Sequence, residues 1–386
     1  MKSVVFVIRT LTNGGVEHSF IRLINELKDY EITVVFAEDD KTLLPLIKNK
    51  AAYVYLTDKG MGIRDKVYLT QSFKNKKPYL FLKASFLTAH ARITKNTDLL
   101  TKFLLRPYKI EEKEFDLAIA YDGGTKSTTP FVVEKIKAAK KVMWVHEDYT
   151  KLSPSEKKEG HKLFLHFDQI FCVSQGAKER FDEVYPELKA KTDVFYSIFN
   201  SQEFIQKAQQ SVSDFQYEGT KILTVGRLSE EKGQEFLPEA AAKLKKSGYS
   251  FKWFLIGEGR IKGKLEKQIK KHGVEDSLIL LGAKENPYPY YKECDIYVQP
   301  SKHEGYCLTM AEAISFGKPV VATNFLTAKE FITHGKDGLI TEMNATAIYE
   351  TIKQVLDNPD LKLQLTRNCE KKSFNTVTEM QKFYAL

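Results

Sequence analysis

The sequence lacks the cysteine patterns that define several protein classes. It contains four cysteines, and none of them forms a CxxC pair: Cys172, Cys294, Cys307 and Cys369. A disulfide framework and a cysteine-rich zinc site are therefore not expected, and this usage fits a reducing compartment.

Long apolar runs are also missing. The apolar run at 4–8 is followed by Arg9 and is too short for the core of a secretion signal. No other stretch reaches about 18 apolar residues without a charge, which a membrane-spanning helix would need. We therefore expect a cytoplasmic protein.

Several ligand-binding motifs are absent as well. Gly257 and Gly259 follow an expected strand, but the third glycine of a GxGxxG motif is missing, which argues against a dinucleotide dehydrogenase. The segment 259–264 misses the P-loop spacing, and the chain contains neither HExxH nor GxSxG. His161 and His166 lie five residues apart and share no helical face, so they make no metal-binding pair.

What the chain does contain is an ordinary globular composition with a repeated strand–helix alternation. Its 386 residues suggest two or three domains of about 150 residues each. Alternating strands and helices predict parallel sheets with crossover helices. Strands are expected at 2–8, 32–36, 53–56, 117–120, 141–145, 169–173 and 194–196, and again at 221–225, 253–256, 277–281, 296–299 and 319–322. Helices are expected at 17–27, 41–48, 175–184, 237–246, 261–272, 345–356 and 361–368.

This pattern divides into two similarly built α/β halves. We expect an N-terminal Rossmann-like domain at 1–200, a polar linker at 201–220 and a C-terminal Rossmann-like domain at 221–372. Two such domains are expected to face each other across a cleft, with ligands at the carboxyl ends of the strands.

Positive charge is concentrated in one segment. Residues 59–109 hold twelve Lys and Arg against Asp65 and Asp98, while the whole chain carries +9. Large apolar side chains are interleaved with these charges, which suits the surface of an anionic membrane. A solvated helical face over an ordinary core is the plain alternative, and nucleic acid is a third that we do not expect.

Two motifs in the second half carry chemistry. In the segment 225–233, VGRLSEEKG, a glycine turn follows a strand, and Arg227 and Lys232 stand five residues apart, so both cations can reach one anion. In the segment 301–312, SKHEGYCLTMAE, Glu304 precedes a helix expected to start near Leu308, and Glu312 lies about one turn further along. Carboxylates of this kind suit sugar and ribose hydroxyls. The plain alternative is a helix-capping Glu304 and a solvated Glu312.

Together these residues resemble glycosyltransferase family 4. The resemblance rests on VGRLSEEKG, the E-x7-E pattern from Glu304 to Glu312 and the GKPVVAT at 317–323, and it is clearest over about 221–345. It extends more weakly to the segments 14–17 and 144–147. The resemblance implies a GT-B fold of two Rossmann-like domains and a retaining, nucleotide-sugar-dependent enzyme of the bacterial cell-surface polysaccharide type. It also implies that the remaining segment, 373–386, forms a helix that crosses back to the first domain.

The resemblance also assigns roles to individual residues. Arg227 and Lys232 match the pair that neutralises the donor diphosphate, and Glu304 matches the glutamate that holds the donor sugar. Glu312 matches the glutamate on the ribose, and His146 the histidine beside the transferred sugar. The implied catalytic set is Arg227, Lys232, Glu304 and His146, and the implied donor-binding set is Gly14, Gly15, Gly226, Lys284, Gly305, Tyr306, Cys307, Leu308, Thr309 and Glu312.

The implied partners follow from this family. We expect a UDP- or GDP-sugar as donor and a lipid-linked saccharide as acceptor, at the inner face of the cell membrane. No metal and no cofactor are expected, because Arg227 and Lys232 supply the positive charge at the diphosphate and no DxD stands at a strand end. A soluble small-molecule acceptor and a noncatalytic sugar-nucleotide-binding protein are the alternatives.

Overall fold

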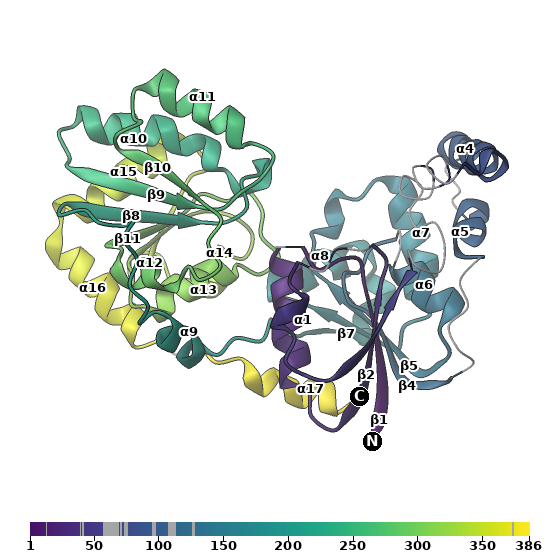
Figure 1. Cartoon of the computed structure of the whole chain (residues 1–386). Helices are drawn as coiled ribbons and strands as arrows, with labels where there is room; N and C mark the ends of the chain where they lie inside the picture. The colour runs from purple at the N-terminus through teal and green to yellow at the C-terminus, as the bar shows by residue number, and fades with distance from the viewer. Residues whose placement is uncertain are drawn as a thin grey trace. The chain divides into compact units, whose positions relative to one another are not determined.

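The computed structural model describes residues 1–12, 14–38, 40, 42–56, 69, 72, 76–94, 98–106, 113–125, 128–372 and 374–386. The chain divides into two compact units (Figure 1). Unit 1 comprises Met1–Ile198 and Val377–Leu386, and unit 2 comprises Phe199–Thr376. Each unit is a parallel α/β sheet layered with helices, so the predicted fold class is confirmed.

The described part of unit 1 contains a seven-stranded sheet in the order β3-β2-β1-β4-β5-β6-β7. Every pairing in it is parallel, as in the register Val4↔Ile32 and Val4↔Leu117. The central strands β1 and β4 are short apolar runs buried on both faces, which is typical of a sheet covered by helices on each side, whereas no residue of the edge strand β3 is buried. Their bounds are β1 Lys2–Ile8, β2 Tyr30–Phe36, β3 Ala51–Tyr55, β4 Phe115–Ala120, β5 Ala138–Val145, β6 Gln169–Cys172 and β7 Thr192–Val194.

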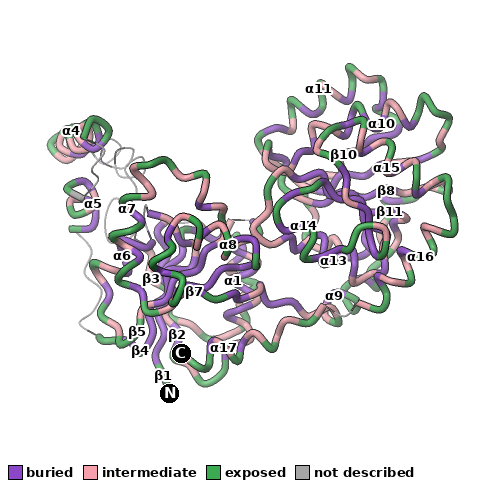
Figure 2. The backbone as a smooth tube through the Cα atoms, turned by 180° about the vertical axis from the view of Figure 1, so that it is seen from behind, coloured by how far each residue is buried: buried purple, intermediate pink, exposed green. Residues whose placement is uncertain are grey.

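The helices of unit 1 connect these strands. Figure 2 shows the buried strands inside and the exposed helix faces outside. The predicted helix at 41–48 is not observed over the described residues there, which hold only the short 3₁₀ turn η1, Leu44–Leu46, because Pro45 supplies no backbone donor. The other helices are α1 Gly15–Glu26, α4 Pro78–Thr94, α5 Asp98–Leu105, α6 Thr128–Lys135, η2 Tyr149–Lys151, α7 Pro154–Phe164, α8 Gln175–Val184 and η3 Pro186–Lys191.

The basic segment 59–109 is described only in part. Within it, α4 and α5 pack against each other through a small cluster that includes Ala84, Ala91, Leu100 and Leu104. Lys59, Arg64, Lys66, Lys74, Lys95, Lys109 and Asp65 lie outside the described residues. Nowhere in the described ranges is a helix both long and apolar enough to cross a membrane.

Unit 2 contains a six-stranded parallel sheet over its described residues, in the order β10-β9-β8-β11-β12-β13. The strand order reverses between β8 and β11, so the carboxyl ends of these two strands flank the switch point at which such sheets bind ligands. The strands are β8 Thr220–Val225, β9 Phe251–Ile256, β10 Leu278–Gly282, β11 Ile296–Gln299, β12 Val320–Thr323 and β13 Leu339–Thr341.

The helices of unit 2 cover both faces of this sheet. They are α9 Ser201–Lys207, η4 Glu230–Lys232, η5 Gln234–Phe236, α10 Leu237–Lys246, α11 Lys262–His272, α12 Tyr288–Glu293, α13 Leu308–Ser315, α14 Ala328–Phe331, α15 Ala345–Asp357 and α16 Pro359–Glu370. The segment 201–220 differs from the predicted linker, because it forms α9 and buries Phe204, Ala208 and Phe215 in the core of unit 2.

The end of the chain belongs to unit 1. Residues 377–386 form the turn η6, Val377–Glu379, and the helix α17, Met380–Tyr384. Phe383 is fully buried and stacks on Phe6 of the central strand, with 6.2 Å between ring centroids. Lys382 Nζ donates a 2.6 Å hydrogen bond to the carbonyl oxygen of Val194. The amino and carboxyl termini consequently lie near each other in unit 1 (Figures 1 and 2).

Candidate functional site

The loop after β8 is held against its neighbour by direct backbone contact. The Gly226 N–H donates a 2.9 Å hydrogen bond to the carbonyl oxygen of Ile256, and Leu228 N–H donates to Glu258. A Cβ at Gly257 would lie 2.0 Å from the Gly226 carbonyl oxygen, and Gly257 has φ +150°. Glycine is therefore required at 257 for this approach, which gives the rejected Gly257–Gly259 pair a structural role.

Lys232 ends the short turn η4 and is followed by Gly233 in the left-handed conformation, with φ +66°. A Cβ at Gly233 would lie 2.0 Å from the carbonyl oxygen of Pro300. This close approach docks the loop after β8 onto the loop after β11. It brings together two motifs that are about 70 residues apart in the sequence.

The centre of the site is an ion pair between these two loops. Lys232 Nζ lies 2.7 Å from both carboxylate oxygens of Glu304. The Glu304 side chain is 7% exposed and that of Lys232 is 26% exposed. A charge-assisted contact of this kind is short and strong, and it holds both groups at the switch point of the sheet.

Glu304 is fixed by two further donors that the sequence analysis did not identify. Ser301 Oγ donates to Glu304 Oε1 at 2.6 Å, and Gln299 Nε2 lies 3.3 Å from the same oxygen. Gln299 Oε1 in turn accepts hydrogen bonds from Tyr297 at 2.5 Å and Thr309 at 2.9 Å. The sequence does hold one sign of this network, which is a glutamine at the end of the otherwise apolar strand IYVQ. Because a buried amide needs hydrogen-bond partners, such a glutamine indicates polar neighbours.

The electrostatics of the pair keep Lys232 charged. Burial by itself lowers the pKa of Lys232, but the Glu304 carboxylate opposes this effect, and the pKa lies above its usual value overall. Arg227 also acts on this pKa, in the lowering direction, so its charge lies within reach of Lys232. The Arg227 side chain itself is exposed. The two cations of the motif therefore act on one region at the end of β8.

The amino end of α13 completes this corner. Cys307 stands at the N-cap position without a side-chain cap, so Glu304 is not the helix cap of the plain alternative. Leu308 and Thr309 open the helix, whose first N–H groups have no acceptor within the helix. Burial raises the pKa of the Cys307 thiol, which keeps it neutral and disfavours a nucleophilic role. Gly305 and Tyr306 form the turn between Glu304 and Cys307.

Glu312 is buried rather than solvated. It is 5% exposed and lies on α13 among core residues. Burial raises the pKa of Tyr297 and of Tyr291, and the charge of Glu312 contributes to both shifts. The plain alternative of a solvated Glu312 is therefore wrong. Its carboxylate shares the neighbourhood of Tyr297 with Gln299.

Lys284 lies apart from this network. Its Nζ pairs with Asp214 Oδ2 at 2.6 Å and lies 5.9 Å from the centre of the Tyr290 ring. The side chain is thus engaged with the segment before β8. The expected contact of the Lys284 backbone with the donor nucleotide stays a prediction.

Unit 1 carries the remaining predicted residues at the carboxyl ends of β1 and β5. Gly14 is the N-cap of α1, and Gly15 is its first residue. A Cβ at Gly15 would meet no described atom within 4 Å, so the space in front of it is open. Thr12 Oγ1 donates to Glu17 Oε1 at 3.0 Å across the same turn, which shapes the start of the helix.

His146 follows β5 and is partly buried. Its Nε2 lies 2.8 Å from the Tyr121 carbonyl oxygen. Because a carbonyl can only accept, Nε2 carries the proton and Nδ1 carries the lone pair of the neutral ring. Burial lowers the pKa of His146 to about 4, and the hydrogen bond offsets this only in part. His146 is therefore a neutral imidazole at neutral pH.

Beside His146 lies a turn that the sequence analysis missed. Asp122 accepts hydrogen bonds from Thr128 Oγ1 and from the Arg9 N–H. Burial raises the pKa of Asp122 to about 6. Gly123 has φ +55°, and a Cβ there would lie 2.5 Å from the Trp144 carbonyl oxygen, so glycine is needed where β4 meets β5. The sequence feature that indicates this turn is the Asp-Gly-Gly that follows β4.

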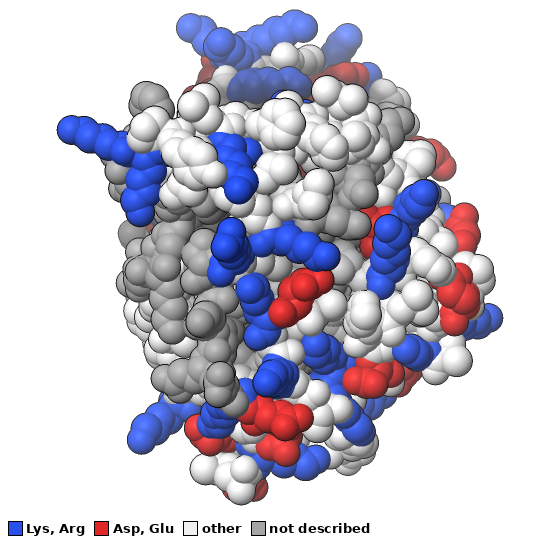
Figure 3. Space-filling view, turned by 90° about the vertical axis from the view of Figure 1, so that its right-hand side faces the viewer, with Lys and Arg blue, Asp and Glu red and all other residues white. Residues whose placement is uncertain are grey.

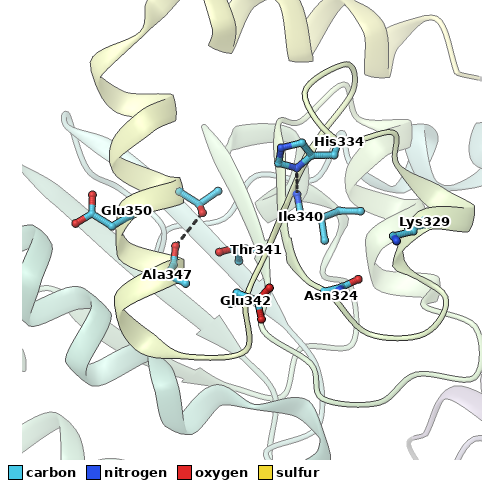
Figure 4. A pocket seen from close by; sticks show the side chains of 9 residues that line it. Asn324, Lys329, His334, Ile340, Thr341, Glu342, Ala347 and Glu350 are labelled. Carbon is cyan, nitrogen blue, oxygen red and sulfur yellow. Dashed lines mark hydrogen bonds between the residues drawn. The ribbon is translucent and has the colours of Figure 1, made fainter.

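Unit 2 also contains an open pocket of about 480 Å³ near the carboxyl ends of β12 and β13. Figure 4 shows His334, which accepts a 2.9 Å hydrogen bond from the Ile340 N–H, among the lining residues. None of the predicted site residues lines this pocket. Within the described ranges, no group of three His, Cys, Asp or Glu is arranged to hold a metal ion.

Part of the second half of the chain is similar to a known protein family. Residues 206–372, which include Arg227, Lys232, Glu304 and Glu312, match the family model described as Glycosyl transferases group 1. The match covers less than half of the chain, and over this range the chain is similar to that family. The matched range thus includes the Lys232–Glu304 pair at the switch point of the sheet of unit 2.

Named glycosyltransferases are also similar to this chain over part of its length. An uncharacterized glycosyltransferase from Methanocaldococcus jannaschii is 29% identical over 252 residues, which cover 58% of this chain and 61% of that protein. An N-acetylgalactosamine-N,N'-diacetylbacillosaminyl-diphospho-undecaprenol 4-alpha-N-acetylgalactosaminyltransferase from Campylobacter jejuni is 28% identical over 202 residues, 52% of this chain and 54% of that one. The chain therefore spans 61% and 54% of the lengths of these two relatives.

A solved structure matches both units. The crystal structure of Anabaena HepE in complex with UDP-glucose has a TM-score of 0.73 and 18% sequence identity, and the match covers 100% of this chain and 99% of that one. At this identity the likeness shows the fold. The two parallel-sheet units therefore share the fold of that structure.

Proposed function

We propose that this protein is a retaining glycosyltransferase that moves a sugar from a nucleotide diphosphate donor to an acceptor hydroxyl. The observation that carries the proposal is the Lys232–Glu304 pair of the group 1 domain, with the Arg227 charge beside it. A cation and a carboxylate at one point suit a ligand that presents both phosphate oxygens and sugar hydroxyls.

The donor's groups divide among the site residues by charge. Arg227 and Lys232 would neutralise the diphosphate, while Glu304 accepts hydrogen bonds from the sugar and Glu312 from the ribose. Backbone N–H groups at the start of α13 add positive potential. A uridine diphosphate sugar is the first donor to test, because the related Anabaena structure is a complex with UDP-glucose.

The proposed reaction keeps the configuration of the anomeric carbon. As the glycosidic bond to the phosphate breaks, charge develops on the departing phosphate oxygens, and Arg227 and Lys232 stabilise it from fixed positions. The acceptor hydroxyl attacks from the same face, and the departing phosphate accepts its proton. Since the two cations supply the charge at the diphosphate, no metal ion is required.

The proposed acceptor is a lipid-linked saccharide in the synthesis of a cell-surface glycan. The Campylobacter relative carries a diphospho-undecaprenol acceptor in its name, which supports this class. Such an acceptor would hold the enzyme at the inner face of the cell membrane. Transfer to a soluble saccharide with no transfer to a lipid-linked one would refute this part and leave the donor chemistry standing.

The donor chemistry is tested with a panel of UDP-, GDP- and ADP-sugars. Binding of the correct donor raises the thermal midpoint, since a ligand that binds only the folded state stabilises it. Nuclear magnetic resonance then follows donor hydrolysis and the configuration of the product. Glu304→Gln should abolish both effects, whereas Lys245→Ala, which breaks the exposed pair with Asp276, should leave them unchanged. No shift with any nucleotide sugar would refute the proposal.

A further inference from the structure

One face of α4 exposes large apolar side chains. Tyr79 is 69% exposed, Leu82 66%, Phe86 69% and Ile93 82%. Exposed apolar residues scattered singly are ordinary, but a contiguous row of them marks an interaction surface. These four residues stand on one helix of 17 residues.

The four side chains form a row because of their spacing. An α-helix turns by about 100° per residue, so positions 79, 82, 86 and 93 fall within an arc of about 60°. The buried residues of the helix, Ala84, Thr88 and Ala91, lie on the opposite side. That side packs on α5 through the cluster with Leu100 and Leu104. The helix is therefore apolar on two faces, of which α5 covers one.

The charge around the exposed face is of one sign. The α4 sequence PYLFLKASFLTAHARIT contains no Asp or Glu. Lys83 Nζ lies 5.9 Å from the centre of the Tyr79 ring, at the border of the row, and the exposed Arg92 lies about 80° around the helix from the opposite edge. The neighbouring described cations are Lys76, Lys77, Lys102 and Arg106. Figure 3 shows this side, with uncharged surface bordered by Lys and Arg and most visible Asp and Glu farther down.

We propose that the exposed face of α4 lies on an anionic lipid bilayer. The row Tyr79, Leu82, Phe86 and Ile93 enters the boundary between headgroups and acyl chains, and the flanking cations contact lipid phosphates. An aliphatic Leu82 and Ile93 have no use in stacking nucleic-acid bases. A second copy of the same face is a poor partner, because its Lys and Arg would lie against the Lys and Arg of the first copy. The bilayer is the partner that matches both the apolar row and its positive border.

This surface belongs to unit 1 and contains none of the donor-site residues of unit 2. The proposal therefore goes beyond glycosyl transfer and stands or falls independently of it. A protein that bound vesicles without hydrolysing a donor would support the surface and count against the enzyme. A protein that hydrolysed a donor without binding vesicles would support the enzyme and count against the surface.

The test is flotation of the full chain with vesicles. We expect the protein to float with vesicles of phosphatidylcholine and phosphatidylglycerol, and not with phosphatidylcholine alone. Leu82→Ser combined with Phe86→Ser should lower the partition coefficient about tenfold or more, because two large side chains leave the interface. Lys83→Gln combined with Arg92→Gln should weaken binding and reduce its salt dependence.

Matched controls come from exposed residues elsewhere. Leu165 and Leu363 are 49% and 47% exposed, so Leu165→Ser with Leu363→Ser removes comparable apolar surface outside α4. Lys264→Gln with Lys267→Gln removes two exposed charges of α11. Equal losses in these controls would overturn the proposal. So would a chain that binds no vesicles and forms a dimer in sedimentation that Leu82→Ser and Phe86→Ser dissociate.

Discussion

The Lys232–Glu304 pair makes a quantitative prediction about the stability of unit 2. Lys232→Met removes both 2.7 Å contacts and leaves the Glu304 carboxylate, 7% exposed, without its countercharge. Breaking a buried pair on one side costs about 3–5 kcal/mol. Ser301 and Gln299 still donate to Glu304, and Lys232 is 26% exposed, so we expect a loss of about 2–3 kcal/mol.

The double variant measures the coupling free energy between Lys232 and Glu304. Lys232→Met with Glu304→Gln replaces the stranded charge by a neutral amide that Ser301 can still contact. We expect it to be about 1–2 kcal/mol more stable than the sum of the two single effects, the coupling typical of residues in direct contact. Additivity to within about 0.5 kcal/mol would show that the two side chains do not interact in solution.

The chain offers a convenient reporter for this measurement. It has two tryptophans, Trp144 buried in unit 1 and Trp253 buried in unit 2. In a Trp144→Phe background, fluorescence during urea unfolding reports on unit 2 alone. In the matching Trp253→Phe background, Trp144 reports on unit 1, whose midpoint should not move. A shift of the unit 1 midpoint would mean that the variants act globally.

Three further predictions concern activity and pH. Arg227→Ala should lower kcat by a factor of about 100–1,000 in a donor-turnover assay, as expected for one prearranged charge at a developing anion, and unchanged turnover would place the diphosphate elsewhere. Treatment with EDTA should leave turnover intact; a loss restored by a divalent cation would contradict the proposed role of the two cations. Between pH 4 and 6.5 the unfolded chain protonates histidine while His146, with its pKa of about 4, stays neutral, so acid lowers the unfolding free energy of unit 1. Asp122, with its pKa raised to about 6, binds its proton more readily in the folded chain, so its protonation stabilises unit 1 as the pH falls. Asp122→Asn removes this gain and should make the loss of unfolding free energy in acid steeper, measured by Trp144 fluorescence in the Trp253→Phe background. An unchanged slope would refute the raised pKa of Asp122.

Local patterns in the sequence predicted much of the fold. Apolar runs such as β1, and an amphipathic helix such as α10, stand where expected because their signals lie within a few neighbouring residues. The segment 201–220 was misjudged because polar residues dominate it, whereas Phe204 and Phe215 find their partners only in the folded core. Tertiary burial decided the outcome there.

The site was predictable only in part for the same reason. Charged residues in two motifs that follow strands, Arg227, Lys232, Glu304 and Glu312, stand out in the sequence. Gln299 gives only the signal of a glutamine at the end of an apolar strand, because its partners Thr309 and Ser301 come close only in the folded chain. Similarly, the exposed row on α4 is hidden in the sequence, since apolar residues on two opposite faces give no single amphipathic pattern.

The return of the last residues to unit 1 has a consequence for how the protein is made. Unit 1 is built from both ends of the chain, and Phe383 fills a space against Phe6 that nothing else in the described chain is shown to fill. During synthesis all of unit 2 leaves the ribosome before Phe383 can reach Phe6, so unit 2 can complete its contacts before unit 1 does. A permuted chain that links residue 386 to residue 1 by a short peptide and is opened in a surface loop of unit 2 would let unit 1 be completed first.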